Sequence, residues 1–274
     1  MEFVDTHCHI QSADLADLPF EAEKSTHDMW AKADNLSGDV LVANAVALGV
    51  TKMICVGCTL EDSQLAVEFV KSRENCAASI GIHPHEAALY DGDKAKLDAF
   101  RELAKAEKVV AIGETGFDFY YNHSPKEDQE KILRFQLELA LEHDLPLIFH
   151  VRDAFDDFWR VAKDYPGIRG VIHSFSADRK VLDGILEHGL HVGLNGIMTF
   201  TKFENQLEAA RAVPIDKLLL ETDAPFLTPT PYRGTINQPK NVRVVAEFLA
   251  DLRGETLSDL AAATTRNARA LFKL

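Results

Sequence analysis

Cysteine is scarce in this sequence, and its scarcity excludes a scaffold built on disulfide bonds. The 274 residues include four cysteines, Cys8, Cys55, Cys58 and Cys76. These are too few to cross-link a chain of this length with disulfide bonds. Cys55 and Cys58 have Cys-x-x-Cys spacing, but no second pair accompanies them to complete a thiolate zinc site. We interpret all four as buried or strand-end free thiols in a reducing cytoplasm, with a redox role as the less favoured alternative.

The sequence also lacks a hydrophobic run long enough to span a membrane and an excess of positive charge. Its opening, MEFVDTHCHI, has no basic stretch followed by an apolar core, so we expect a cytoplasmic protein without a membrane partner. The formal net charge is −14 and the isoelectric point is near 5.2. This charge argues against a broad basic surface for duplex DNA, but not against nucleic acid held mainly by metal ions in a narrow site. No segment indicates an obligate protein partner.

No linker, internal repeat or low-complexity tract divides the chain. Short β-branched runs alternate with amphipathic stretches, and helical periodicity is clear over 129–144. The predicted strands are 2–7, 52–57, 77–81, 109–114, 145–150, 170–174, 190–196 and 217–223. Eight such units in about 250 residues are typical of a (β/α)8 barrel. The alternative, an open doubly wound sheet, is less favoured because no glycine-rich phosphate-binding turn follows the first strand. We therefore predict one TIM-barrel domain over residues 1–274.

What the sequence does contain is a set of metal-binding side chains at the ends of predicted strands. Taken singly, each has an ordinary explanation as a core histidine, a helix cap or a turn carboxylate. Together they end five different strands and meet on the face where such barrels build their sites. Four histidines and two carboxylates exceed the needs of one tetrahedral zinc, so we predict two divalent ions per subunit: zinc, magnesium or manganese. The six residues are His7, His9, Glu114, His150, His173 and Asp223.

Longer motifs around these residues resemble the TatD family of metal-dependent hydrolases. The matching stretches are DTHCH, GIHPH, AIGETGFDFY, FHVRDA, HSFSAD, VGLNGIMTF, LLLETDAPFLTP, PYRG and TTRNARALF, and they extend over the whole chain. The resemblance implies that Glu114 bridges two metals, one bound by His7, His9 and Asp223 and the other by His150 and His173. Because members of the family are described chiefly as deoxyribonucleases, it also implies hydrolysis of phosphodiester bonds.

Five further residues are candidates for contacts with the substrate or with the metal ligands. His83 and His85 follow the third predicted strand, where the resemblance suggests such roles; the alternative for His85 is a loop stabilised by proline. Arg152 follows His150 and is suited to bidentate phosphate contact, with surface pairing as the alternative. Glu221 is predicted to point inward and orient a ligand, since it shares strand parity with Asp223. The sequence TINQPKNV after PYRG departs from the family pattern, which weakens the assignment of substrate contacts near Arg233.

Three functions are compatible with these residues. The favoured one is a two-metal phosphodiesterase acting on DNA ends or short fragments, in which Asp223 accepts the proton of the attacking water and Glu114 is the second catalytic residue. The same site on a small-molecule amide, ester or lactone is the alternative. A non-catalytic metal-binding scaffold comes third, because it would need a broken ligand set.

A long connection, at about 11–37, separates the first strand from the helix expected at 38–49. It is acidic, yet it carries Phe20, Met29 and Trp30. As a βα connection it emerges on the catalytic face. Our hypothesis is that residues 12–36 form a partial lid whose negative charge repels long phosphate backbones. The alternative is a solvated excursion that packs its apolar residues on the barrel rim.

Overall fold

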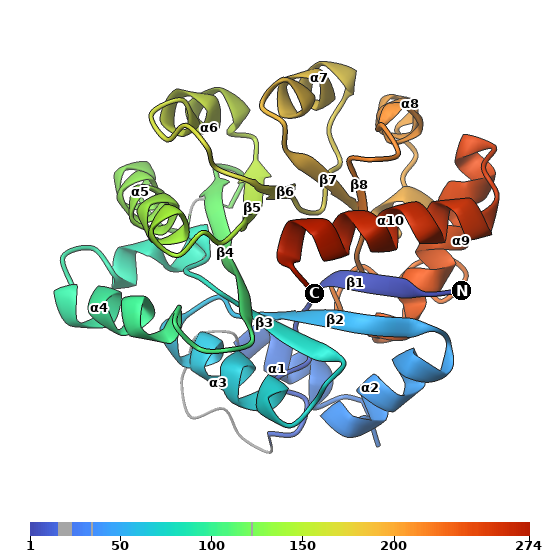
Figure 1. Cartoon of the computed structure of the whole chain (residues 1–274), viewed down its shortest axis with the longest axis horizontal. Coiled ribbons are helices and arrows are strands. Elements are labelled where there is room, and N and C mark those ends of the chain that lie inside the picture. Colours follow the sequence, from blue (N-terminus) through green and yellow to red (C-terminus); the bar gives the residue numbers. More distant parts are fainter. Residues whose placement is uncertain (16–23, 34, 122) are drawn as a thin grey trace.

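Eight parallel strands follow one another in chain order around the centre of the molecule (Figure 1). The computed structural model describes residues 1–15, 24–33, 35–121 and 123–274. Its strands are β1 (Phe3–Cys8), β2 (Val50–Val56), β3 (Cys76–Ile80), β4 (Val109–Asp118), β5 (Leu147–Arg152), β6 (Gly170–Ile172), β7 (His191–Leu194) and β8 (Leu218–Leu220). Strands and helices alternate as expected for a TIM barrel, so the predicted fold class is confirmed.

The ring of strands closes where the chain beyond β8 meets β1. The backbone N–H of Asp223 donates to the carbonyl of His7 at 2.8 Å, and the N–H of His9 donates to the carbonyl of Ala224 at 2.7 Å. Asp223 has a φ of 58°, a left-handed conformation that Asp tolerates better than most residues. This junction places Asp223 directly beside the two N-terminal histidines.

Helices surround the barrel and cover the apolar outer faces of its strands. They are α1 (Lys24–Trp30), α2 (Gly38–Ala47), α3 (Leu60–Lys71), α4 (Lys94–Leu103), α5 (Lys126–Glu142), α6 (Phe155–Ala162), α7 (Arg179–Glu187), α8 (Glu204–Ala212), α9 (Val242–Arg253) and α10 (Leu257–Phe272). Three 3-10 turns, η1 (Pro84–Leu89), η2 (Gly196–Thr199) and η3 (Pro239–Asn241), complete the described elements. The helical periodicity noted over 129–144 corresponds to α5.

Strand β4 continues four residues beyond the predicted end at Glu114. The extension pairs with β5, with Gly116 opposite His150 and Asp118 opposite Arg152. Gly116 has a φ of 146°, and a Cβ there would lie 2.0 Å from the carbonyl oxygen of His150. Only glycine permits this close approach, which carries the strand as far as Asp118.

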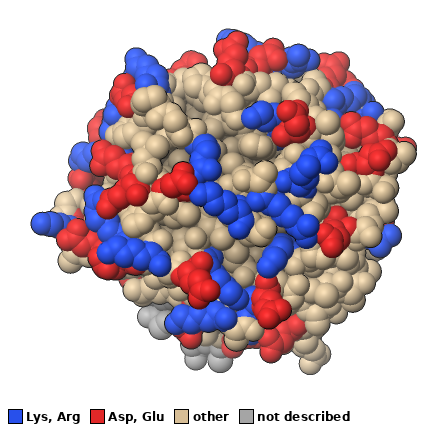
Figure 2. Space-filling model, viewed as in Figure 1, with Lys and Arg blue, Asp and Glu red and all other residues tan. Residues whose placement is uncertain are grey.

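Helix α10 closes the N-terminal end of the barrel (Figure 1). Its residues Ala268, Leu271 and Phe272 pack against interior side chains of the strands, among them Val4 and Ile148. Figure 2 shows Lys and Arg side chains crossing the middle of the face viewed in Figure 1, with acidic side chains around them. Because α10 fills this end, the strand ends that carry the predicted ligands open on the opposite face.

The long connection contains a short helix that is anchored near the predicted site. Trp30 is 3% exposed, and its Nε1–H donates to the carbonyl oxygen of His9 at 2.7 Å. The packing of Trp30 agrees with the alternative interpretation of the connection. Residues 16–23 and 34 of the hypothetical lid, Phe20 among them, lie outside the described residues. Among the described residues, no helix is both long and apolar enough to cross a membrane.

Candidate active site

The first half of the site lies where β1 and β8 end. The Nε2 atoms of His7 and His9 are 3.1 Å apart. Oδ1 of Asp223 lies 3.6 Å from Nε2 of His7 and 3.4 Å from Nε2 of His9. Nδ1 of His9 faces the carbonyl oxygen of Val56 at 2.8 Å, which fixes the ring and leaves Nε2 directed at the cluster. These two nitrogen atoms and one oxygen atom therefore lie close enough together to bind a single cation.

The second half is formed by the ends of β5 and β6. Nδ1 of His150 and Nε2 of His173 are 3.2 Å apart, and each lies 2.7 Å from Oε1 of Glu114. The other oxygen of this carboxylate, Oε2, lies 3.4 Å from Nε2 of His7. Glu114 thus presents one oxygen to each half of the histidine cluster. All six predicted ligands are brought together.

The electrostatics of the cluster favour a bound positive charge. Burial opposes ionisation of Glu114, but the neighbouring His173, His83 and His150 outweigh it and hold the pKa of this carboxyl well below its usual range. Burial likewise opposes protonation of His173, yet Glu114 and Glu221 raise the pKa of this imidazole well above its ordinary value. For His7, burial and the charge of His173 lower the pKa, which favours the neutral imidazole that binds metal ions.

Two carboxylates lie behind the histidine rings. Oε1 of Glu221 accepts from the N–H of Ser174 at 2.6 Å and lies 3.7 Å from Nδ1 of His173, which is beyond hydrogen-bond distance, so its orienting role stays a prediction. Asp118 was missed by the sequence reading, although it falls on the same side of β4 as Glu114. Its Oδ2 lies 3.1 Å from Nε2 of His150 and 2.9 Å from Nε2 of His85. Burial acts to raise the pKa of Asp118, but the hydrogen bonds from these histidines hold it well below its usual range.

His83 and Cys58 also lie close to the carboxylate of Glu114. Nε2 of His83 lies 3.5 Å from Oε1 of Glu114, and burial lowers the pKa of His83 to about 4. Sγ of Cys58 lies 3.7 Å from Oε2 of Glu114. As predicted, all four cysteines are buried thiols outside disulfide bonds. The Cys-x-x-Cys spacing did not reveal that Cys58 faces the site while Cys55 packs in the core.

All of the predicted ligands except His7 line a cavity of about 1100 Å³ that opens on the C-terminal face of the barrel. Arg152 is on its rim, with the guanidinium 4.1 Å from the ring centroid of Tyr120 and 4.8 Å from that of Tyr121. Arg233 does not line this cavity. It lies in an adjoining groove and stacks at 3.9 Å on Phe200, which is a cavity residue.

Groups that can hold a metal recur throughout the described part of this cavity. Four sets of three side chains bring their ligand atoms within 4.8 Å of one another: His7, His9 and Glu114; His7, His173 and Glu221; His83, Glu114 and His150; and His9, Cys58 and Asp62. The last set is the least suited, since Nδ1 of His9 already faces the Val56 carbonyl. A TIM barrel with such a cluster at its strand ends has the architecture of a metal-dependent hydrolase.

Comparison with known proteins agrees with this architecture. The family model described as TatD related DNase matches residues 4–273. The chain belongs to this family and is a metal-dependent hydrolase.

The similarity to known proteins extends over most or all of the chain. The uncharacterized metal-dependent hydrolase YcfH of Escherichia coli K12 is 36% identical over 100% of this chain and 97% of its own length. The 3'-5' ssDNA/RNA exonuclease TatD of Salmonella typhimurium is 35% identical over 86% of this chain and 93% of its own length. Among solved structures, the TatD homologue YJJV of Escherichia coli K12 has a TM-score of 0.83 and 27% identity, covering 99% of this chain and 98% of that chain.

Proposed function

We propose that the protein is a two-metal deoxyribonuclease that hydrolyses phosphodiester bonds. One observation supports this above the others: Glu114 directs Oε1 to His150 and His173 and Oε2 to His7. A carboxylate placed in this way could be a ligand to two cations. His7, His9 and Asp223 would then hold one cation, and His150 with His173 would hold the second.

The donor set fits divalent cations. Imidazoles and carboxylates suit zinc, and the carboxylates together with phosphate chemistry also allow magnesium or manganese. When bound, two such ions lower the pKa of a water molecule and stabilise the charge that develops on a phosphodiester.

The protein's own groups then position the substrate and move protons. Asp223 is partly exposed to the cavity, with a side chain 16% accessible, so it is the carboxylate best placed to accept the proton of the attacking water. Asp118 and Glu221 hold the rings of His150 and His173 in orientation. On the rim, Arg152 is available to pair with a phosphate oxygen, since it stacks on tyrosine rings instead of forming an ion pair with a described residue.

The substrate that best fits is the end of a nucleic acid strand. The Salmonella relative is named a 3'-5' ssDNA/RNA exonuclease. The cavity of about 1100 Å³ is large enough for a nucleotide, while the net charge of −14 of the chain disfavours a long duplex.

The test is hydrolysis by metal-loaded protein of a labelled single-stranded DNA oligonucleotide, beside simple esters, amides and lactones. We expect metal-dependent release of nucleotides, removal of activity by a chelator, and no turnover of the small substrates. Turnover of an ester or lactone without release of nucleotides would replace this proposal with the small-molecule hydrolase. Inactivity on every substrate by protein with both metals bound would favour the non-catalytic scaffold.

A further inference from the structure

A second groove adjoins the catalytic cavity on the same face of the barrel. It has a volume of about 730 Å³ and is formed by the end of α1 with its following turn and by the segment after β8. Its apolar wall includes Met29 and Ile236, and its size falls in the range of about 300–1000 Å³ usual for small-ligand sites.

The groove borders the catalytic cavity. Phe226 and Leu227 line both, so a strand that crosses these two residues would pass from the cavity into the groove. Arg233 connects the two as well, because its guanidinium lies 3.9 Å above the ring of Phe200 in the cavity while its side chain lines the groove. On the opposite wall, α1 is fixed to the site by the hydrogen bond from Trp30 to the carbonyl of His9.

The charge of the groove is opposite to that of the protein. Lys32 and Arg233 both line it, and none of the described lining residues is acidic, although the chain carries 43 acidic against 29 basic residues. Lys32 is exposed and forms no ion pair with a described residue. Arg233 donates from Nη1 to the carbonyl of Thr228 at 2.8 Å, and its other N–H groups are available to an anion.

We propose that this groove binds the nucleotide next to the scissile phosphate of a single-stranded substrate, with Lys32 and Arg233 holding its phosphate and the apolar wall contacting its base. The inference rests on the proposed function and adds a subsite to it. The affinity of the protein for its substrate then depends on a second phosphate, which a dinucleotide with a single phosphodiester does not have.

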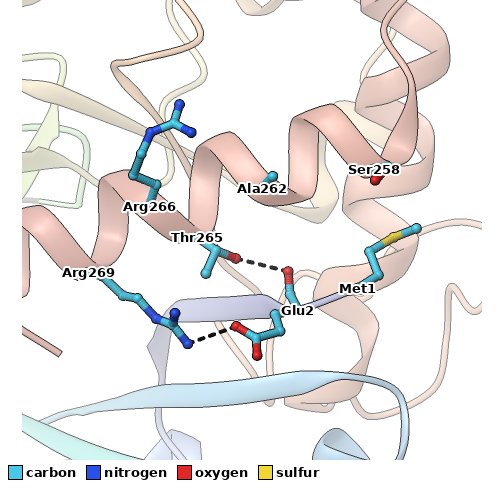
Figure 3. A pocket seen from close by; sticks show the side chains of 7 residues that line it. All are labelled: Met1, Glu2, Ser258, Ala262, Thr265, Arg266 and Arg269. Atoms are coloured by element: carbon cyan, nitrogen blue, oxygen red, sulfur yellow. Dashed lines mark hydrogen bonds and ion pairs between the residues drawn. The ribbon is translucent and has the colours of Figure 1, made fainter.

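The test compares Lys32→Gln and Arg233→Gln with Arg266→Gln as matched control. Arg266 is an exposed residue of α10 and lines a pocket of about 400 Å³ on the opposite face of the barrel (Figure 3). Its loss changes the net charge equally. KM and kcat are measured on a dinucleotide with a single phosphodiester and on a hexanucleotide, over a series of salt concentrations. Metal content and thermal unfolding verify that each variant is folded and loaded.

For Lys32→Gln we expect a KM about three- to tenfold higher on the hexanucleotide, an unchanged kcat, and wild-type kinetics on the dinucleotide. The slope of log KM against log salt concentration should decrease by about 0.7, the value for one lost phosphate contact on a single strand. Arg233→Gln should act in the same direction, and Arg266→Gln should match the wild type.

Hexanucleotide KM values and salt slopes that stay at wild-type values in both groove variants would overturn the subsite while leaving the nuclease intact. An equal rise in KM for Arg266→Gln would overturn it too, since the effect would then be general electrostatics. Wild-type protein that cleaves neither substrate would overturn the proposed function and the subsite together.

Discussion

Glu114 is the residue through which the two halves of the histidine cluster are connected. Its side chain is almost completely buried, and each of its oxygens faces a different set of imidazoles. An isosteric change that removes its charge therefore tests the dinuclear model without creating a cavity.

We expect Glu114→Gln to lower kcat by more than about 100-fold and to lose at least one metal. Mutating a group that only hydrogen-bonds to a metal ligand usually lowers metal affinity or activity about 10- to 100-fold, and loss of a ligand shared by two metals should have a larger effect. Metal stoichiometry by elemental analysis, together with kcat, provides the measurement. Glu130→Gln, which alters a surface ion pair with Arg160, is the control. Full metal content with a near-normal rate would contradict a bridging role.

Asp118 acts on the site through two rings, those of His150 and His85. In Asp118→Asn the shape is kept, but the charge that favours the correct orientation of His150 is lost. We expect metal affinity to decrease about 10- to 100-fold, with kcat largely restored at high metal concentration. A titration of activity against free metal measures this. A loss of kcat that saturating metal does not restore would place Asp118 in the chemistry itself.

At the scale of elements, α1 is a short helix that Trp30 anchors to the site. Trp30 supplies both a buried ring and the hydrogen bond to His9, while helices this short have little stability of their own. The wall of the groove is therefore held in place by a contact with the strand that carries two of the predicted ligands.

Substitutions of Trp30 separate these two contributions. Trp30→Phe should cost about 1 kcal/mol for the lost hydrogen bond, and Trp30→Ala about 3–5 kcal/mol for the lost side chain. Denaturant unfolding gives the free energies, and hydrogen exchange of Lys24–Trp30 shows whether the loss is local. Unchanged exchange and stability in Trp30→Ala would mean that α1 is held by other contacts.

At the scale of the whole molecule, stability depends on pH through groups remote from the site. His191 begins β7, and burial together with the charge of Lys217 lowers its pKa from 6.5 to about 4. As pH falls, the unfolded chain binds a proton at this residue before the folded protein does. The contribution of neutral His191 to the free energy of unfolding is therefore complete above about pH 6.5 and is lost as the pH falls toward 4.

His191→Gln should accordingly lose less stability than the wild type between pH 7.5 and 4.5. The full pKa shift would correspond to about 1.36 kcal/mol for each pKa unit. We expect the loss of stability in the two proteins to differ by less than this, on the order of 1–2 kcal/mol, because the ring is partly accessible to solvent. Urea unfolding at the two pH values measures it. His188→Gln, which removes an exposed histidine, is the control, and parallel pH dependence of His191→Gln and wild type would contradict the prediction.

Local sequence determined the barrel and the composition of its site. Alternation of β-branched runs with amphipathic stretches is a property of neighbouring residues, and it located all eight strands. The polar residues that end these runs, such as His150 and Glu114, could also be recognised, since parallel strands in a barrel end on one face. Their location on one face of the barrel therefore followed from the fold class.

Only the tertiary structure decided which atoms meet. The pairing of β4 with β5 extends the strand to Asp118, and this extension depends on the carbonyl of His150 lying against Gly116, a contact between residues 34 positions apart in the sequence. Lys32 and Arg233 both line the groove, although they lie near opposite ends of the chain. The ring closure between β1 and β8 brings these ends together, and no local pattern encodes a contact over such a separation.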